Sequence, residues 1–166
     1  MQLFILDREP DRVPGLLCDV HVRKMALETA QILSSVIVLQ GGKTAPGMPK
    51  PYNLNHPVIR ALDSPWKVNW TLRFNAALHA EYRYRFGRAH AYAPLCAVYM
   101  DMLFRELPPE TVPDWTFGRV FKNFTTDEPD LIRAWRLYYR SKKRVIRNWR
   151  YTRRAEPGWL RLESGI

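Results

Sequence analysis

The sequence is poor in cysteine and has no long apolar segment. Its two cysteines, Cys18 and Cys96, are too few for the disulfide framework of a small secreted domain. No run of about 18 apolar residues occurs, and the first residues lack the basic leader and small-residue cleavage site of a signal peptide. We therefore expect no membrane-spanning helix and reduced thiols, in a protein that stays in the cytoplasm where it is made.

Several nucleotide-binding and catalytic motifs are also missing. The chain has no phosphate-binding glycine loop, no dinucleotide fingerprint and no nucleophile elbow, so nothing favours a kinase, a dehydrogenase or a hydrolase. Cys18 and His21 have the spacing of metal ligands, but no second close pair completes a tetrahedral site. We expect neither a metal nor another cofactor.

Acidic residues are scarce relative to basic ones. The chain has 26 Lys and Arg against 16 Asp and Glu, a formal charge of +10. Residues 130–154 hold ten of these cations and one acid, so the rest of the chain is close to neutral. Such a surplus is typical of proteins that bind nucleic acid, an anionic membrane or an acidic protein. Its concentration in one segment favours nucleic acid, DNA rather than RNA, and no membrane.

The residues that are present predict a mainly α fold. With 46% apolar residues and 13% aromatics, residues 1–166 can bury the core of a single compact domain of about four helices. Helical spacing and capping residues predict the helices, and proline and glycine mark the loops. The predicted segments are a short strand or extended arm at 2–6, helices at 19–39, 66–87, 94–106 and 130–154, and a proline-rich ordered loop at 41–65.

The helix predicted over 130–154 has two unlike faces. One face is apolar, and the opposite face carries cations at steps of three, four or seven residues. A solvated face is the alternative, but solvated faces usually mix both signs of charge. Arginine suits bidentate contacts with phosphate, so we expect this face to bind DNA. The predicted DNA-binding residues are Arg133, Arg136, Arg140, Lys143, Arg144 and Arg147.

A polar stripe runs along the helix predicted over 19–39. His21, Lys24 and Glu28 fall on one face of this helix, with His21 and Glu28 two turns apart. An imidazole, an amine and a carboxylate on one stripe are the ingredients of acid/base or imine chemistry. The alternative is a capped helix with an ordinary exposed face.

The helix predicted over 66–87 and the loop before it offer a second set. Trp66, Trp70, Arg73 and Glu81 share one helix face, where tryptophans bracket a charged pair. This arrangement fits a pocket for an extruded base, and equally a buried ion pair in an aromatic core. The polar pair Asn55 and His56, which precedes a proline in the long loop, is predicted to line the same pocket. The predicted substrate-binding residues are Arg73, Glu81, Trp66, Trp70, Asn55 and His56.

Three of these segments contain motifs that stand out together. The motifs are Cys18-Asp19-x-His21-Val22-x-Lys24-Met25-x-x-Glu28-Thr29-Ala30-Gln31, Asn55-His56-Pro57, and Glu81-Tyr82-x-x-Arg85-Phe86-Gly87-Arg88-x-His90. These motifs resemble a family of small phage-borne proteins, and the similarity extends into the basic segment at Trp135 and Trp149 and so spans most of the chain. The resemblance implies a phage-encoded protein that acts in the host cytoplasm.

The first motif has an Asp, then a His, and then a Glu seven residues after the His. This order is more distantly similar to the phage pyrimidine-dimer DNA glycosylase/AP lyase family. Its members are small, basic, helical proteins that flip a base and act through an N-terminal amine and a helix-borne Glu. The resemblance implies Glu28 as the catalytic carboxylate and the amine of Met1 as the nucleophile. The sequence departs from that family where Leu27 and Gln31 replace arginines that flank the carboxylate. Gln2 is also too bulky for removal of Met1 to be expected.

Three functions remain open at this stage. The first is a phage-type enzyme that excises or modifies a DNA base, with Glu28, His21, Lys24 and Met1 as catalytic residues. The second is a non-catalytic DNA-binding or host-takeover protein. The third is an enzyme that acts on a small nucleotide.

Overall fold

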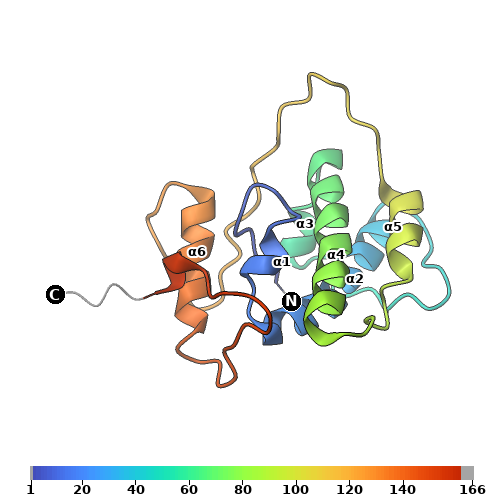
Figure 1. Ribbon diagram of the computed structural model, residues 1–166. Coiled ribbons are helices and arrows are strands. Elements are labelled where there is room, and N and C mark those ends of the chain that lie inside the picture. Colours follow the sequence, from blue (N-terminus) through green and yellow to red (C-terminus); the bar gives the residue numbers. More distant parts are fainter. Residues whose placement is uncertain (1, 162–166) are drawn as a thin grey trace.

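The computed structural model describes residues 2–161, and the regular secondary structure of these residues is all helical, with no strand among them (Figure 1). The mainly α prediction is therefore confirmed. The elements, in chain order, are α1 (Val13–Leu16), α2 (Asp19–Leu39), α3 (Pro57–Arg60), α4 (Pro65–Phe86), α5 (Leu95–Leu103), α6 (Leu131–Lys142) and the short 3-10 helix η1 (Gly158–Leu160).

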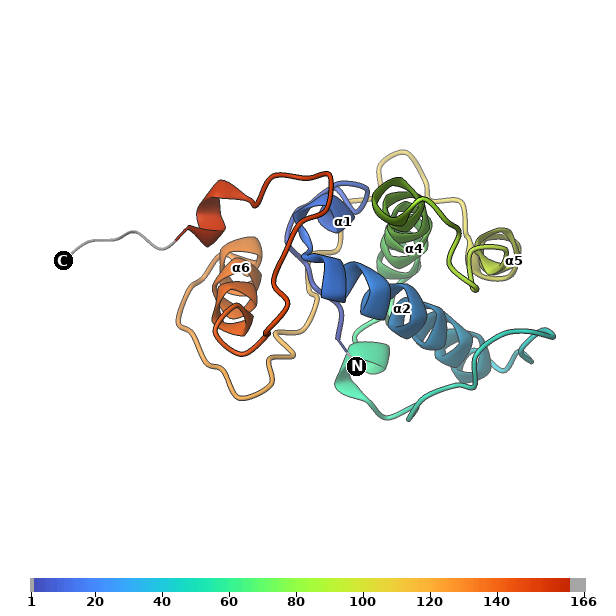
Figure 2. The same ribbon diagram turned by 60° about the horizontal axis from the view of Figure 1, so that its bottom comes forward.

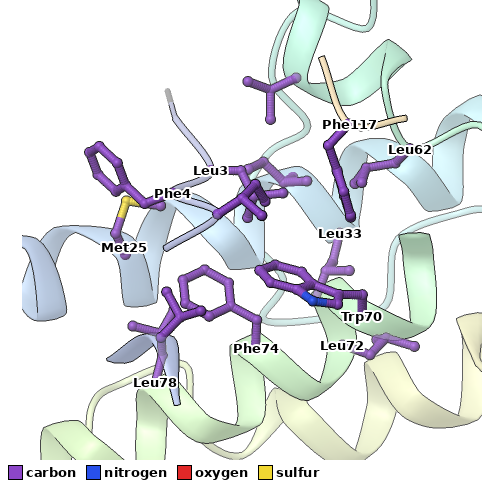
Figure 3. Packing of buried hydrophobic residues seen from close by; sticks show 14 of the residues in the cluster. Leu3, Phe4, Met25, Leu33, Leu62, Trp70, Leu72, Phe74, Leu78 and Phe117 are labelled. Atoms are coloured by element: carbon purple, nitrogen blue, oxygen red, sulfur yellow. The ribbon is translucent and has the colours of Figure 1, made fainter. Parts of the chain in front are cut away.

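The two long helices α2 and α4 form the centre of the molecule and have the bounds that the sequence predicts to within one residue. Ser64 caps α4 by accepting a hydrogen bond from the Lys67 amide, and Gly87 ends it in the left-handed conformation at φ 68°. A residue without a Cβ adopts this conformation at little cost. Figure 3 shows side chains of α2 and α4, such as Leu33 and Phe74, meeting in one apolar core.

Residues 2–6 form an extended arm and not a strand. The side chains of Leu3 to Leu6 are buried, so the arm is part of the core. The Phe4 ring lies 4.8 Å from the ring of His21 on α2 and 5.0 Å from that of Tyr139 on α6, measured between centroids. The arm therefore runs between the α2/α4 core and α6, which lies to one side of the molecule in both ribbon views (Figures 1 and 2).

The proline-rich loop and the third helix also differ in detail from the prediction. Residues 41–65 are irregular except for the single turn of α3. The helix predicted over 94–106 is α5, which ends at Leu103 because Phe104 is already extended.

The prediction of one helix over 130–154 is wrong in its length. α6 ends at Lys142, and the chain then turns. Val145, which was predicted to lie on the apolar face of that helix, is 72% exposed. The segment that follows finds better partners across the molecule: the Asp19 amide donates to the Arg150 carbonyl, and Thr152 donates to the Asp19 carboxylate. These tertiary hydrogen bonds replace the helical ones.

Candidate functional site

The carboxylate of Glu28 lies where the N-terminal arm crosses α2. Its Oε2 accepts a hydrogen bond from the backbone amide of Gln2 at 3.2 Å, and its Oε1 is 3.3 Å from the Lys24 ammonium. The Glu28 side chain is only 12% exposed, whereas that of Lys24 is 57% exposed. Met1, the predicted nucleophile, lies outside the described residues. The structure thus joins Lys24 and Glu28, as the stripe predicts, and adds Gln2.

Gln2 also links this carboxylate to α6. Its side-chain amide donates to the Val120 carbonyl and to the Tyr138 hydroxyl, the latter at 3.1 Å. The same hydroxyl accepts the Lys122 amide at 3.2 Å. No pattern in the sequence marks Gln2 as a site residue, because its role depends on the path of the arm through the fold.

His56, at the end of the proline-rich loop, lies within electrostatic range of Glu28. Its Nδ1 caps α3 by accepting from the Val58 amide, and its ring packs edge-on to Tyr52. Burial lowers the pKa of His56, while Glu28 acts in the opposite direction. Asn55, which was predicted to line the same pocket, is exposed and accepts a hydrogen bond from Arg60 at 2.9 Å. The loop therefore brings His56 rather than Asn55 toward the carboxylate.

His21 faces the arm and α6. Its Nδ1 lies 2.8 Å from the Tyr139 hydroxyl and 3.5 Å from the Cys18 sulfur, and its ring packs on Phe4. Burial, reinforced by the charge of Lys24, lowers the pKa of His21 to about 4, so the ring is neutral near pH 7. Within residues 2–161 its hydrogen-bond partners do not include Glu28. This geometry fits a core histidine that fixes the position of α6.

The charged pair predicted between Arg73 and Glu81 does not exist. Arg73 is exposed and pairs with Glu9 and Asp11, which lie just after the N-terminal arm. The distance along α4 explains the difference, because eight residues place the two side chains about 12 Å apart along the helix axis.

The two tryptophans that were predicted to stack a base pack in the core and line a separate groove. Trp70 is buried, and its indole nitrogen donates to the Arg8 carbonyl at 2.9 Å. Trp66 packs edge-on to Trp115, with ring centroids 4.8 Å apart. Trp66, Trp70 and Arg73 do line one groove of about 360 Å³, but no residue of α2 lines it. The other lining residues are Arg8, Glu9, Pro10, Asn69, Phe104, Leu107, Pro113 and Trp115. This pocket is therefore not shared with Glu28.

Glu81 belongs to a buried ionic network. The Arg85 guanidinium, whose side chain is 0% exposed, lies 2.6 Å from Glu81 and 3.0 Å from Asp19, and it also donates to the carbonyls of residues 14, 15 and 17. Arg154 completes the network at 2.8 Å from Glu81. Burial alone would raise the pKa of Glu81, but hydrogen bonds from Arg154 and Arg85 lower it. The carboxylates of Asp19 and Glu81 are thus held ionised, and all four charged groups are paired.

This network explains part of the sequence motifs. Asp19 and Arg85 come from the first and third motifs, which are more than 60 residues apart, and the fold brings them into contact. Neither residue has a role that its sequence pattern predicts, although both occupy fixed positions in these motifs.

The six cations predicted to bind DNA divide into two groups. Arg133, Arg140, Arg144 and Arg147 have no acidic partner among residues 2–161. Arg136, in contrast, donates to the Leu6 carbonyl at 2.9 Å and lies 3.7 Å from Asp7. Lys143 forms an ion pair with Glu156 at 2.8 Å.

The arginine face of α6 points away from Glu28. Tyr138 faces Gln2, and Arg136 and Arg140 are each two positions from Tyr138, which places them on the opposite side of the helix. Lys142, one turn after Tyr138, is on the Tyr138 side, with its ammonium 4.3 Å from the centroid of that ring. Lys24 thus contacts Glu28 directly, and Lys142 lies beside the Tyr138 ring, whose hydroxyl is bonded to Gln2.

Within the part of the chain that the structure describes, no helix is long and apolar enough to cross a membrane. The same residues contain no group of three or more His, Cys, Asp and Glu side chains arranged to hold a metal ion. Comparisons with protein-family models, curated proteins and solved structures found no match.

Proposed function

We propose that this protein is a phage-type enzyme that acts on DNA and excises or modifies a nucleobase at Glu28. The observation that carries the proposal is the double contact of Gln2, which holds the Glu28 carboxylate with its backbone and the Tyr138 hydroxyl of α6 with its side chain. A single residue of the arm thus links a largely buried carboxylate to α6, on the side of that helix where Lys142 lies beside Tyr138. Glu28 is the general acid or base in this proposal.

The surroundings of Glu28 suit an anionic substrate. Lys24 is mostly exposed, and Lys142 lies on the same side of α6 as Tyr138, so both can contact phosphates on either side of a base that reaches the carboxylate. His56 contributes a ring within electrostatic range of Glu28, and burial lowers the pKa of this ring. A base must leave the duplex to reach such a site, or be presented in a single strand.

Glu28→Gln tests the enzymatic part of the proposal. The amide oxygen of Gln can still accept the Gln2 hydrogen bond, so the arm stays in place while the acid/base group is lost. We expect turnover of a panel of DNA duplexes with damaged or modified bases to fall by about 100-fold or more, with unchanged DNA affinity. Glu106→Gln, at an exposed acid, is the matched control. Full activity of Glu28→Gln on the preferred substrate would remove Glu28 from the mechanism.

Borohydride trapping separates two forms of the reaction. If base excision proceeds by attack of an amine on the sugar C1′, the base leaves and an imine links protein and DNA, which borohydride reduces to a stable amine. A trapped complex, mapped by mass spectrometry to Lys24 or to the predicted nucleophile Met1, supports the lyase form. Base release by active protein without trapping supports direct displacement by water.

A non-catalytic DNA-binding or host-takeover function is the second candidate. It is favoured by the orientation of α6, since Arg133, Arg136 and Arg140 lie on the face opposite Tyr138 and form a binding surface that does not need Glu28. In that case Glu28→Gln leaves DNA binding and phage growth unchanged. An enzyme acting on a small nucleotide, the third possibility, would instead retain activity when Arg133 and Arg140 are both replaced by Gln.

A further inference from the structure

A second groove lies on the arginine face of α6. The 3-10 helix η1 packs beside α6 (Figure 2). The groove has a volume of about 300 Å³. Leu160 is fully buried and anchors η1 against α6, which fixes the neighbouring Trp159 at the groove wall. We call this the α6 groove; its lining residues are Glu128, Arg133, Arg136, Leu137, Arg140 and Trp159.

The floor of the α6 groove is cationic and partly preorganised. Arg133 and Arg140 are seven residues apart, which places them two turns apart on one face, about 10 Å along the axis. Neither guanidinium has a hydrogen bond or ion pair with any of residues 2–161. Between them, Arg136 is fixed by the Leu6 carbonyl and lies 5.3 Å from the centroid of the Trp159 ring. Two free guanidinium groups therefore flank one that is already held.

The α6 groove also contains side chains that can recognise a base. Trp159 is partly buried and supplies an aromatic wall, and bases stack well on such rings. Glu128 accepts the Asp130 amide at 3.0 Å with one carboxylate oxygen and retains acceptor capacity toward the groove. A carboxylate of this kind accepts hydrogen bonds from exocyclic amino groups, as on cytosine.

We propose that the α6 groove binds one nucleotide of a single DNA strand, with phosphates at Arg133 and Arg140 and the base against Trp159. A base in a duplex is stacked between its neighbours, so this contact requires a single strand or an extruded nucleotide. Glu128 favours bases with an amino group over thymine. The inference rests on the DNA partner proposed above, but it does not require turnover at Glu28.

The test is the affinity of labelled single-stranded 12-mers of deoxycytidine and of thymidine, measured by fluorescence anisotropy. We expect Trp159→Leu, which keeps an apolar side chain without a stacking ring, to weaken binding about 5- to 100-fold. Trp115→Leu, at a partly buried tryptophan of the α4 region, is the matched control and should change affinity less than about twofold. Circular dichroism of both variants establishes that they are folded.

Two further variants test the groove without removing an aromatic residue. The double variant Arg133→Gln/Arg140→Gln should weaken binding more than Arg144→Gln/Arg147→Gln, which removes equal charge outside the groove. Glu128→Ala should abolish a preference for the deoxycytidine strand of about 2- to 10-fold.

The possible failures are distinguishable. One failure is salt-dependent DNA binding that Trp159→Leu does not change and that both arginine pairs weaken equally. This result would overturn the assignment of the α6 groove as the binding site but leave the proposed DNA partner intact. Displacement of the 12-mer by deoxycytidine monophosphate at equal concentration would overturn the assignment to a strand in favour of a free nucleotide. Absence of any DNA binding by the unaltered protein would overturn the proposed function and this inference together.

Discussion

The arginines of this protein occupy two opposite environments. Arg85 is completely buried and contacts Asp19, Glu81 and three backbone carbonyls, whereas Arg133 and Arg140 line a groove with no partner among residues 2–161. A charge in the interior must be paired to offset its lost hydration, while a charge at the surface keeps its hydration and is free to meet a ligand. The same residue type is therefore structural in one region and available for recognition in the other.

The largest expected effect comes from breaking the buried network. Arg85→Gln leaves Asp19 and Glu81 buried without their shared cation, so we expect the free energy of unfolding to fall by about 3–5 kcal/mol. Urea denaturation measures this loss. Arg83→Gln, at an exposed position on the same helix, should change it by less than about 0.5 kcal/mol. Equal effects of the two substitutions would contradict the distinction between buried and surface arginines.

The next effect concerns buried histidines, which contrast with the network because they are neutral. Burial lowers the pKa of both His21 and His79 to about 4. In the unfolded chain these groups bind protons near pH 6.5, so stability is complete above that pH and is lost as pH falls from 6.5 to 4. Each histidine accounts for a loss of about 3 kcal/mol.

His79→Leu isolates one of these contributions. Both ring nitrogens of His79 lack a hydrogen-bond partner within the described chain, so an apolar replacement removes an unsatisfied polar group. We expect equal or higher stability at pH 7 and a smaller loss between pH 7 and pH 4 than in the unaltered protein. Urea unfolding at both pH values gives the comparison, and an unchanged pH dependence would show that His79 is protonated at its usual pH.

A smaller effect is expected at the rim of the network. Arg154 binds Glu81 through two nitrogens, but its side chain is 44% exposed and Glu81 keeps Arg85 as a partner. Arg154→Gln should therefore lower the free energy of unfolding by about 1 kcal/mol. The exposed Arg150→Gln serves as control in the same denaturation experiment. A loss as large as that of Arg85→Gln would mean that the network depends equally on both cations.

The smallest effect on stability is expected at the α6 groove, where the effect on binding is larger. Arg140→Gln should change the free energy of unfolding by less than about 0.5 kcal/mol. It should reduce the slope of log affinity against log salt concentration by about 1, because one phosphate contact is lost. Salt titrations of DNA binding measure the slope. An unchanged slope would place Arg140 outside the DNA interface.

The long helices were predictable because their signals are local. In α2 the apolar positions repeat within one or two turns, and in α4 Ser64, Pro65 and Gly87 mark the ends. The end of α6 was not predictable in this way. Residues 143–154 continue the helical pattern of charge, but their partners Asp19 and Glu81 lie far away in the sequence.

The candidate site was likewise predictable only where its contacts are local in the sequence. Helical spacing alone placed Lys24 and Glu28 on one stripe, and in the structure they form an ion pair. Spacing could not indicate that Gln2 holds Glu28, because that contact depends on the arm crossing α2 after the chain has folded. It also grouped Arg73 with Glu81 on one face, although Arg73 pairs with Asp11 and Glu81 with Arg154, which come from other parts of the chain.

The sequence by itself determined that this protein is helical, where its two central helices lie, and that one segment carries most of its net charge. Periodicity, caps and charge are properties of neighbouring residues, so no distant contact is needed to read them. Only the tertiary structure decided which charged side chains are paired with an opposite charge. Arg85 and Arg154 are neutralised by acids from other parts of the chain, while Arg133 and Arg140 are not. Pairing depends on distances in space and on burial, and both arise only when the helices pack.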